Sequence, residues 1–342
     1  MRRLLYLGYF VIKTDYSDLS ASIGCAVRKG YGRAWLLADM TYCAVVFGSS
    51  FVDYFNFQFY RKSKEERAAY ATMGYMYRFH RALNAPEAIP LVDNKFLFPE
   101  NFGHLCNRSR TFTDFEVEAL KSFLMARVGG NVVFKDPYST AGRSVRIIKV
   151  YEGPMGLMLD GDTFEDFCSV MFHRYQVIYL EEYIEQHEAI AAISPSGVNT
   201  IRVITVVEPD RQVKVLGAIF RISVNNSLDN FSQGNLAAEI DQKTGMVLTG
   251  GIRKRSSCDS YHDIHPVTGA TIKGFQIPYW QEIIACAMQA ALIVPEVRSV
   301  GWDIAVTSDG PILVEGNSKW ATGTWQIPAG YGKKSLIAAY LD

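Results

Sequence analysis

The sequence predicts an α+β protein in which a mostly helical N-terminal region precedes a small lobe and a larger, β-rich lobe. Residues 1–93 are rich in aromatic residues and have helical spacing, whereas the later residues alternate strand-like runs with short amphipathic helices. The length of 342 residues suits about two domains, and 49% hydrophobic residues suffice for a sizeable core. We divide the chain at 1–93, 94–184 and 185–342.

The later elements follow from periodicity and from capping residues. Residues 114–128 are predicted to be a helix with Asp114 as N-cap and Gly129-Gly130 as its stop, and residues 163–172 a helix capped by Asp162. The helical spacing of residues 62–83 predicts a further helical segment. The other predicted elements are strands at 131–135, 144–150, 176–184, 200–207, 213–223, 236–240 and 246–249, and a helix at 279–293.

Residues 299–317 are predicted to form a β-hairpin, closed by a three-residue loop at Ser308-Asp309-Gly310. This loop would pair Thr307 with Pro311, Ala305 with Leu313 and Asp303 with Glu315. Because side chains alternate along a strand, one face would carry only apolar residues and the other three polar ones. The expected apolar residues are Ile304, Val306, Ile312 and Val314, and the polar ones are Asp303, Glu315 and Asn317.

The polar face of this hairpin suggests a metal site. Two directly opposed carboxylates repel each other unless a cation lies between them. Oxygen ligands of this kind suit Mg²⁺, which typically combines carboxylates, waters and phosphate oxygens. A solvent-facing hairpin with an acidic edge is an equally simple interpretation of the spacing.

Other polar residues are candidates for anion binding. Lys135 ends a predicted strand before the small, donor-rich loop at residues 136–143, and such a loop can close over phosphate oxygens. Arg202 and Arg221 lie on neighbouring strands and are suited to phosphate or carboxylate binding. The alternatives are an ordinary connection with a solvated lysine, and structural ion pairs.

The composition argues against several classes of protein. Lys plus Arg equals Asp plus Glu at 35 each, which argues against nucleic-acid binding, and no apolar run is long enough to span a membrane. Six scattered cysteines without a Cys-x-x-Cys pair are typical of free thiols in a reducing compartment. We expect a cytoplasmic protein; its oligomeric state is left open, with a homodimer among the options.

Taken in order, these features resemble the ATP-grasp superfamily. The sequence is most similar to the sugar-transfer-associated ATP-grasp family, and the resemblance covers roughly residues 70–335. The stretches that carry it are Tyr183-Ile-Glu-Gln-His187, Val198-Asn-Thr-Ile-Arg-Val203, Asp229-Asn230-Phe231, His265-Pro-Val-Thr-Gly269, Gly301-Trp-Asp-Ile-Ala305 and Val314-Glu-Gly-Asn317.

The resemblance implies an ATP-grasp fold, in which two α+β lobes clasp ATP and Mg²⁺, and it assigns the site residues. It implies phosphate contacts from Lys95, Lys135, Ser139, Thr140 and Gly142; adenine contacts from Glu181, Glu182, Tyr183 and Ile184; a ribose contact from Glu188; metal ligands Asp303, Glu315 and Asn317; Arg221 and Arg202 at the transferred phosphoryl group; and substrate contacts from Asn199, Lys319, Trp320 and Lys333. The chain departs from the family in the single glycine of its loop, Gly142, and in its helical N-terminal region.

The activity implied by the resemblance is ATP-dependent ligation of a small-molecule carboxylate to an amine through an acyl phosphate. The family's association with cell-surface polysaccharides suggests an amino acid joined to a sugar acid. The alternatives are an amino-acid or peptide ligase of a natural-product pathway, and a kinase that makes a stable phosphorylated product.

Overall fold

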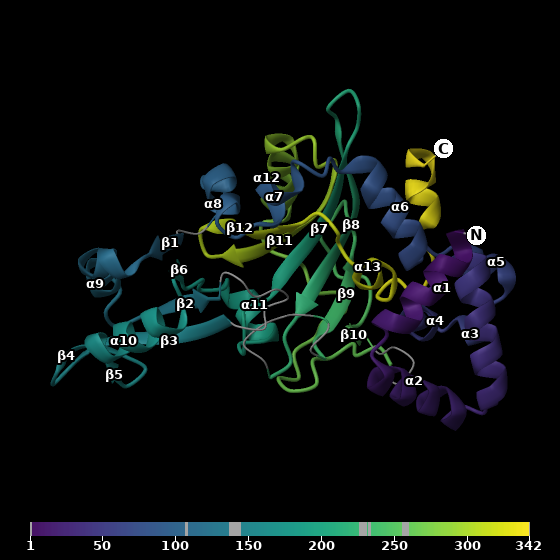
Figure 1. The fold of residues 1–342 in the computed structure, drawn as a ribbon, viewed down its shortest axis with the longest axis horizontal. Helices are drawn as coiled ribbons and strands as arrows, with labels where there is room; N and C mark the ends of the chain where they lie inside the picture. The colour runs from purple at the N-terminus through teal and green to yellow at the C-terminus, as the bar shows by residue number, and fades with distance from the viewer. Residues whose placement is uncertain are drawn as a thin grey trace.

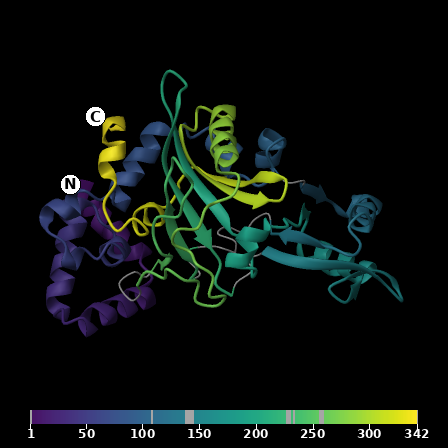
Figure 2. The same ribbon diagram turned by 180° about the vertical axis from the view of Figure 1, so that it is seen from behind.

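The chain folds into three parts that lie in a row in the computed structural model (Figure 1). A small sheet lies at one end, the large sheet in the middle and the N-terminal helices at the other end, where both termini also lie (Figures 1 and 2). The structure describes residues 2–106, 109–136, 145–225, 231, 234–254 and 260–341. The predicted loop residues Ser139, Thr140 and Gly142, and the stretch Asp229-Asn230, lie outside the described residues.

The N-terminal region is helical, as predicted, and packs as a cap on the large sheet. Its aromatic side chains, including Tyr54 and Phe59, are buried in one cluster with Ile204 of the sheet and with Trp325. The aromatic richness of this region therefore serves mainly packing. Its elements are α1 (Arg2–Lys13), α2 (Tyr16–Arg28), α3 (Arg33–Phe47), α4 (Phe51–Asn56), the 3-10 helix η1 (Phe59–Arg61), α5 (Lys64–Ala68) and α6 (Met73–Leu83).

Two details of the N-terminal region differ from expectation. The segment at residues 62–83 is two helices, because the chain between them is held by tertiary contacts: the Ala71 amide donates to Gln326 Oε1 at 2.9 Å. Cys25 in α2 is disulfide-bonded, so the prediction of free thiols throughout is wrong at this position.

The small lobe contains a six-stranded sheet in the order β1-β6-β2-β3-β4-β5, with its own core. The N-caps are Thr113 and Thr163, not Asp114 and Asp162. The Thr163 hydroxyl accepts from the Asp166 amide at 3.1 Å, and the Thr113 amide donates to Glu116 Oε2 at 3.0 Å. Its elements are β1 (Ser109–Phe112), the 3-10 helix η2 (Asp114–Glu116), α9 (Val117–Met125), β2 (Asn131–Lys135), β3 (Val145–Gly153), β4 (Gly156–Leu159), β5 (Asp162–Thr163), α10 (Phe164–Arg174) and β6 (Ile178–Glu182).

The large lobe contains a second six-stranded sheet, in the order β10-β9-β8-β7-β11-β12. The strand predicted at 246–249 is absent; these described residues form only isolated bridges, such as that between Ile240 and Val247. The elements are α11 (Glu188–Ile193), β7 (Thr200–Val207), β8 (Val213–Ile222), β9 (Leu236–Ile240), β10 (Ile252–Arg253), α12 (Trp280–Ile293), β11 (Ser299–Thr307), β12 (Gly310–Asn317), α13 (Thr322–Gln326) and the 3-10 helix η4 (Lys334–Tyr340).

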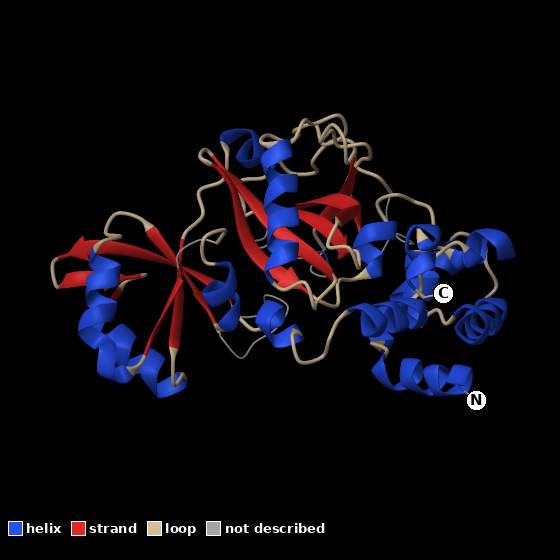
Figure 3. Cartoon of the chain, turned by 90° about the horizontal axis from the view of Figure 1, so that it is seen from above, coloured by secondary structure: helices blue, strands red, loops and turns tan. Residues whose placement is uncertain are grey.

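The two faces of the large sheet have different covers. Helix α12, together with α11 and the short helices α7 (Ile89–Asp93) and α8 (Leu97–Phe102), packs on the face that buries Trp302 and Ile304 (Figure 3). The N-terminal helices and α13 pack on part of the opposite face, which buries Ile204 and Ile219. Because side chains alternate along β11, Asp303 projects from this second face.

The predicted hairpin is present, with one error of register. Asp303 pairs with Glu315 as predicted, but Ala305 pairs with Ile312 and Thr307 with Gly310. The loop has two residues, and a β-bulge next to Asp303 compensates for the difference. Gly310 has a φ of 119°, a conformation that favours glycine.

The bulge also changes which side chains share a face. Leu313 is buried with Ile304 and Val306, whereas Ile312 and Val314 are only half-buried, so their prediction as part of that apolar face is wrong. Among the helices that the structure describes, none combines the length and apolar character needed to cross a membrane.

Candidate functional site

Charged side chains form a row across the large sheet. Glu315, Asp303, Arg202, Ile219 and Glu239 pair in turn across β12, β11, β7, β8 and β9. Cross-strand partners project from the same face of a sheet. These side chains therefore lie side by side on the sheet surface that the N-terminal helices partly cover. The row therefore places two separate groups of charges on one surface.

Asp303 is the centre of the first group. Its side chain is only 1% exposed and it accepts hydrogen bonds from two arginines. Arg202 binds it with both arms of the guanidinium, Nε to Oδ1 at 2.7 Å and Nη2 to Oδ2 at 2.6 Å, and Arg221 Nη1 also donates to Oδ2. Burial alone would raise the pKa of Asp303, but the charges of Arg202 and Arg221 outweigh it and hold that pKa well below its usual value.

Glu315 lies opposite Asp303 and is much more open, with 55% of its side-chain surface accessible. Arg202 Nη2 lies 3.9 Å from its carboxylate, and the Asn317 amide donates to Glu315 Oε1 at 3.2 Å. The partial loss of hydration against the surrounding protein, followed by the repulsion of the Asp303 carboxylate, raises the pKa of Glu315 to about 6. The three residues predicted as metal ligands are thus brought together.

Two lysines approach from the small lobe and its connection. Lys135 ends β2 and its Nζ lies 2.6 Å from Glu181 Oε2 on the neighbouring strand β6. Lys95, between α7 and α8, donates to the Asp136 carbonyl at 2.7 Å. Burial and then the nearby charge of Lys135 lower the pKa of Lys95, opposed by Asp136, Glu315 and Glu181. Lys95 is therefore close enough to interact electrostatically with carboxylates of both lobes, Glu181 and Glu315.

The predicted hinge follows the end of β6. Glu182 forms an ion pair with Arg127, whose guanidinium lies 3.6 Å from the centre of the Phe123 ring; sequence reasoning did not identify this arginine. Tyr183 and Ile184 follow the strand, and the His187 amide donates to the Val306 carbonyl of β11 at 2.7 Å. This contact attaches the hinge to the large sheet.

Glu188 begins helix α11 directly after the hinge, with His187 as the N-cap. The His187 ring nitrogen Nδ1 accepts from the Ala189 amide at 3.1 Å. The carboxylate of Glu188 thus lies in the first turn of a helix, where a negative charge is favourable.

Two residues predicted to contact substrate, Asn199 and Trp320, form hydrogen bonds within the protein. The Asn199 amide is buried and donates to Gln186 Oε1, while its Oδ1 accepts from the Ser223 backbone and hydroxyl at 2.8 and 3.0 Å, so its hydrogen-bonding capacity is used within the protein. Trp320 is 2% exposed, packs against Trp325 and donates to Ser299 Oγ at 2.9 Å. Their predicted substrate contacts stay predictions.

Lys333 and Lys319, the other predicted substrate residues, lie in different surroundings. Lys333 is 5% exposed, and its Nζ lies 2.7 Å from Glu239 Oε1 at the far end of the charged row. Burial lowers the pKa of Lys333, and Glu239 opposes this shift. Lys319 is exposed and lies near His80, whose pKa is lowered to about 4 by burial and then by the Lys319 charge.

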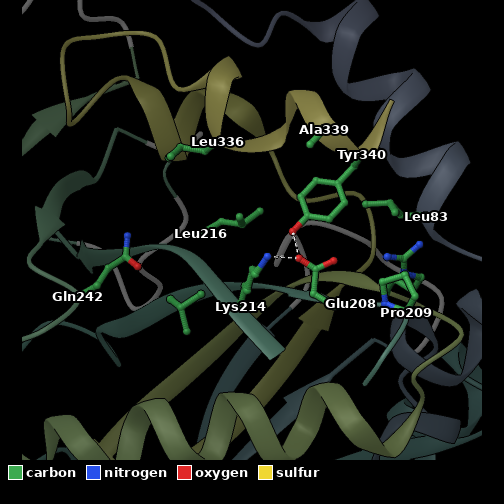
Figure 4. Close-up of a pocket in the computed structure, with 11 residues that line it drawn as sticks. Leu83, Glu208, Pro209, Lys214, Leu216, Gln242, Leu336, Ala339 and Tyr340 are labelled. Atoms are coloured by element: carbon green, nitrogen blue, oxygen red, sulfur yellow. Dashed lines mark hydrogen bonds and ion pairs between the residues drawn. The ribbon is translucent and has the colours of Figure 1, made fainter. Parts of the chain in front are cut away.

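A separate cavity of about 720 Å³ lies between the ends of β7 and β8 and the helix η4 (Figure 4). Its apolar walls include Leu83, Leu216 and Leu336, and Glu208 in it accepts from Lys214 and from the Tyr340 hydroxyl. None of the cavity-lining residues belongs to the charged row. This cavity is therefore distinct from the site around Asp303.

The order of these features along the chain agrees with one protein family. Residues 75–339 match the family described as sugar-transfer associated ATP-grasp. The chain belongs to this family. Its fold is an ATP-grasp fold, in which the two sheets form the two lobes.

Solved structures similar to the chain include other ATP-grasp proteins at low identity. The ATP-grasp ligase PsnB complexed with a minimal precursor is 14% identical with a TM-score of 0.44, over 78% of this chain and 67% of that one. A RimK domain ATP-grasp protein from Sphaerobacter thermophilus is 12% identical with a TM-score of 0.40, over 74% and 69%. The ADP complex of purK, N5-carboxyaminoimidazole ribonucleotide synthetase, is 13% identical with a TM-score of 0.40, over 68% and 46%. No curated protein matches the chain.

The residues around Asp303 fit a magnesium ion bound together with phosphate. Within the described part of the chain, no group of three or more His, Cys, Asp or Glu side chains could hold a metal ion by itself. Asp303 and Glu315 supply two carboxylates and Asn317 an amide oxygen, and Mg²⁺ typically completes such a set with water and phosphate oxygens. The arginines and lysines beside them suit the phosphates.

Proposed function

We propose that this protein is an ATP-dependent carboxylate–amine ligase that forms an amide through an acyl phosphate. The observation that carries the proposal is the pairing of opposed carboxylates, Asp303 and Glu315, with two arginines on the same face of the large sheet. Lys95 of the connection to the small lobe lies near enough to Glu315 for the two charges to interact, and Lys135, paired with Glu181, lies near Lys95. Arginines and lysines that converge from both lobes suit a polyphosphate ligand.

In this proposal ATP lies between the two lobes. Lys95 and Lys135 neutralise its phosphates, and the backbone and side chains at Glu181–Ile184 contact the adenine, with Glu188 at the ribose. Glu181 holds Lys135 in the structure, so we expect the lysine to exchange this partner for a phosphate oxygen. The resemblance assigns further phosphate contacts to Ser139, Thr140 and Gly142, which lie outside the described residues.

The chemistry has two steps. An oxygen of the substrate carboxylate attacks the γ-phosphorus, the bond to the β-γ bridging oxygen breaks, and ADP leaves. The amine nitrogen then attacks the acyl carbon, the carbon–oxygen bond to phosphate breaks, and the amine loses a proton as inorganic phosphate leaves. Arg202 and Arg221 stabilise the charge on the transferred group, and the clasped lobes exclude water that would hydrolyse the acyl phosphate. Asp303, Glu315 and Asn317 would hold Mg²⁺, which would supply neutralisation of the phosphate charge.

We further propose that the substrates are small molecules, an amino acid and a sugar acid, and that the product enters cell-surface polysaccharide synthesis from the cytoplasm. The family's association with sugar transfer supports the sugar acid. The exposed ammonium of Lys319, which follows the metal ligands directly, is available for a substrate carboxylate.

The test is release of ADP and phosphate from Mg-ATP with a panel of amino acids and uronic acids, singly and in pairs, with mass spectrometry of the products. The proposal predicts phosphate release only when a carboxylate and an amine are both present, and a product lighter than their sum by one water. A phosphorylated acceptor without an amide would show a kinase instead and contradict the proposal.

A further inference from the structure

The carboxylate best placed to bind a metal is already fully engaged by arginine. Both oxygens of Asp303 accept hydrogen bonds from Arg202, at 2.7 and 2.6 Å, and Oδ2 also accepts from Arg221. Arg202 lies directly opposite Asp303 on the adjacent strand, so the sheet itself aligns the pair. Asp303 is also only 1% exposed and two guanidiniums surround its carboxylate, so a metal that binds Asp303 must displace at least one of these donors.

The charges around Asp303 make this exchange unfavourable for a bare cation. The carboxylates of Asp303 and Glu315 are matched by the guanidiniums of Arg202 and Arg221, and all four lie in contact or within 4 Å of a partner. A divalent ion added to this balanced group would meet two fixed positive charges in a poorly hydrated site. Lys95, which senses Glu315, adds a further positive charge.

Nucleotide phosphates change this balance. A guanidinium forms two parallel hydrogen bonds with phosphate as readily as with carboxylate, so Arg202 and Arg221 have a second partner once phosphates arrive. Asp303 is then released with both oxygens free. Glu315 is 55% exposed and lies beside Arg202, so the exchange takes place at the open side of the group.

We propose that Arg202 and Arg221 block the metal site in the nucleotide-free enzyme, so that the divalent cation binds only together with nucleotide phosphate. This inference rests on the proposed ATP-dependent function and adds an obligatory order to it. Arg202 is a positioning residue in the free enzyme, because it holds the Asp303 carboxylate aligned and unavailable. It prevents the protein from taking up metal ions alone.

The test uses Mn²⁺ as a paramagnetic probe of the site, with free Mn²⁺ measured by electron paramagnetic resonance. Wild-type protein is titrated with Mn²⁺ alone and with Mn²⁺ plus a non-hydrolysable ATP analogue, and the same titrations are made on Arg202→Met and Arg221→Met. The matched control is Arg67→Met, which removes an arginine from a similar two-armed pair with Asp39, at 2.8 and 3.0 Å, in the N-terminal region. Thermal melting establishes that each variant is folded, and Arg221→Met carries the test if Arg202→Met is not.

The proposal predicts no measurable binding of Mn²⁺ alone to the wild type or to Arg67→Met, and binding at least about tenfold tighter to Arg202→Met or Arg221→Met. Wild-type protein that binds Mn²⁺ alone, with loss of that binding in Asp303→Asn, would overturn it. So would a folded Arg202→Met or Arg221→Met variant without any gain in Mn²⁺ affinity.

Failure of this inference is separable from failure of the proposed function. If the ATP analogue binds to the wild type but the arginine variants gain no metal affinity, only the blocking role is wrong. If the ATP analogue itself does not bind in the presence of Mn²⁺, the proposed function is wrong, and the ordered binding is wrong with it.

Discussion

Two buried ion pairs lie on the same face of the large sheet, one at each end of a single cross-strand row, and they differ in how their charges are balanced. Asp303 is shared by Arg202 and Arg221 and stands beside a second, open carboxylate, Glu315. At the other end, Glu239 is paired with one cation, Lys333, and also has a hydrogen bond with the Tyr331 side chain. Lys333 Nζ lies 5.6 Å from the centre of the Trp325 ring. Ile219 separates the two groups.

Under the proposed function, this difference separates the nucleotide site from a structural contact. At Glu239 one positive charge meets one negative charge and the surroundings enclose both, so the pair attaches the C-terminal segment to β9. At Asp303 several cations converge next to an exposed carboxylate, and the group can exchange partners. Burial alone does not distinguish them; the number of charges and the access of solvent do.

The largest expected effect is on catalysis at the Asp303 end. Asp303→Asn keeps the shape of the side chain but removes the charge that the metal and both arginines require, so ATP-dependent product formation should fall by about a thousandfold. The rate is measured as phosphate release under saturating substrates. Glu239→Gln is the matched control, and a similar loss in that variant would remove the distinction between the two ends.

The second effect is on stability at the Glu239 end. Lys333→Met leaves the partly buried Glu239 carboxylate without its cation and should lower the free energy of unfolding by about 2 kcal/mol. Denaturant unfolding measures the loss, and the double variant with Glu239→Gln should recover most of it. The turnover of the folded fraction should be unchanged; a large rise in the KM of one substrate would instead assign Lys333 to the substrate site.

A smaller effect is expected where the Trp325 ring packs on Gly217 of β8. A Cβ atom on Gly217 would lie 2.6 Å from Trp325 Nε1, and the ring is fully buried. Gly217→Ala should therefore cost about 2 kcal/mol of stability through overpacking, without changing nucleotide binding. Thermal melting and nucleotide titration together check this, and an unchanged melting temperature would show that the ring moves freely.

The smallest effect concerns a buried carboxyl group in the N-terminal cap. Burial raises the pKa of Asp53 to about 6, against hydrogen bonds from the Met73 and Ser50 amides that favour its charged form. The folded protein therefore holds a proton that the unfolded chain has released above about pH 4. The stabilisation from this group is complete below that pH and is lost as pH rises through about 6.

Asp53→Asn removes this titration. As the pH rises from 4.5 to 7, the melting temperature of the wild type should fall by about 3 °C relative to that of the variant. A difference that is constant across this range would contradict the assigned pKa.

The sequence alone predicted the parts of the site that depend on local pairing. Asp303 and Glu315 lie on one hairpin, so alternation and a turn signal were enough to place them opposite each other. The bulge beside Asp303 was not visible in the pattern, and the predicted pairs nearer the turn were wrong for that reason. The caps at Thr113 and Thr163 differ from prediction by one residue, which is within the uncertainty of helix ends.

Contacts between segments that are distant in the sequence could not be predicted from alternation and turn signals. Arg202 lies 101 residues from Asp303, and only the order of the strands in the sheet shows that the two are paired. The same holds for Glu239 and Lys333, 94 residues apart. The hydrogen bonds by which the Asn199 amide connects Ser223 with Gln186 were likewise not visible in the sequence. Spacing indicates which residues are near in sequence and gives no information on such partners.

The most direct test of the central claim is the fate of a carboxylate oxygen. A substrate carboxylate found with the panel is labelled with heavy oxygen and allowed to react with the amine and Mg-ATP, and the released phosphate is analysed by mass spectrometry. Attack of the carboxylate on the γ-phosphate predicts one labelled oxygen in the phosphate for each amide formed, with loss of both products in Asp303→Asn. Amide formation with unlabelled phosphate would contradict the acyl-phosphate mechanism.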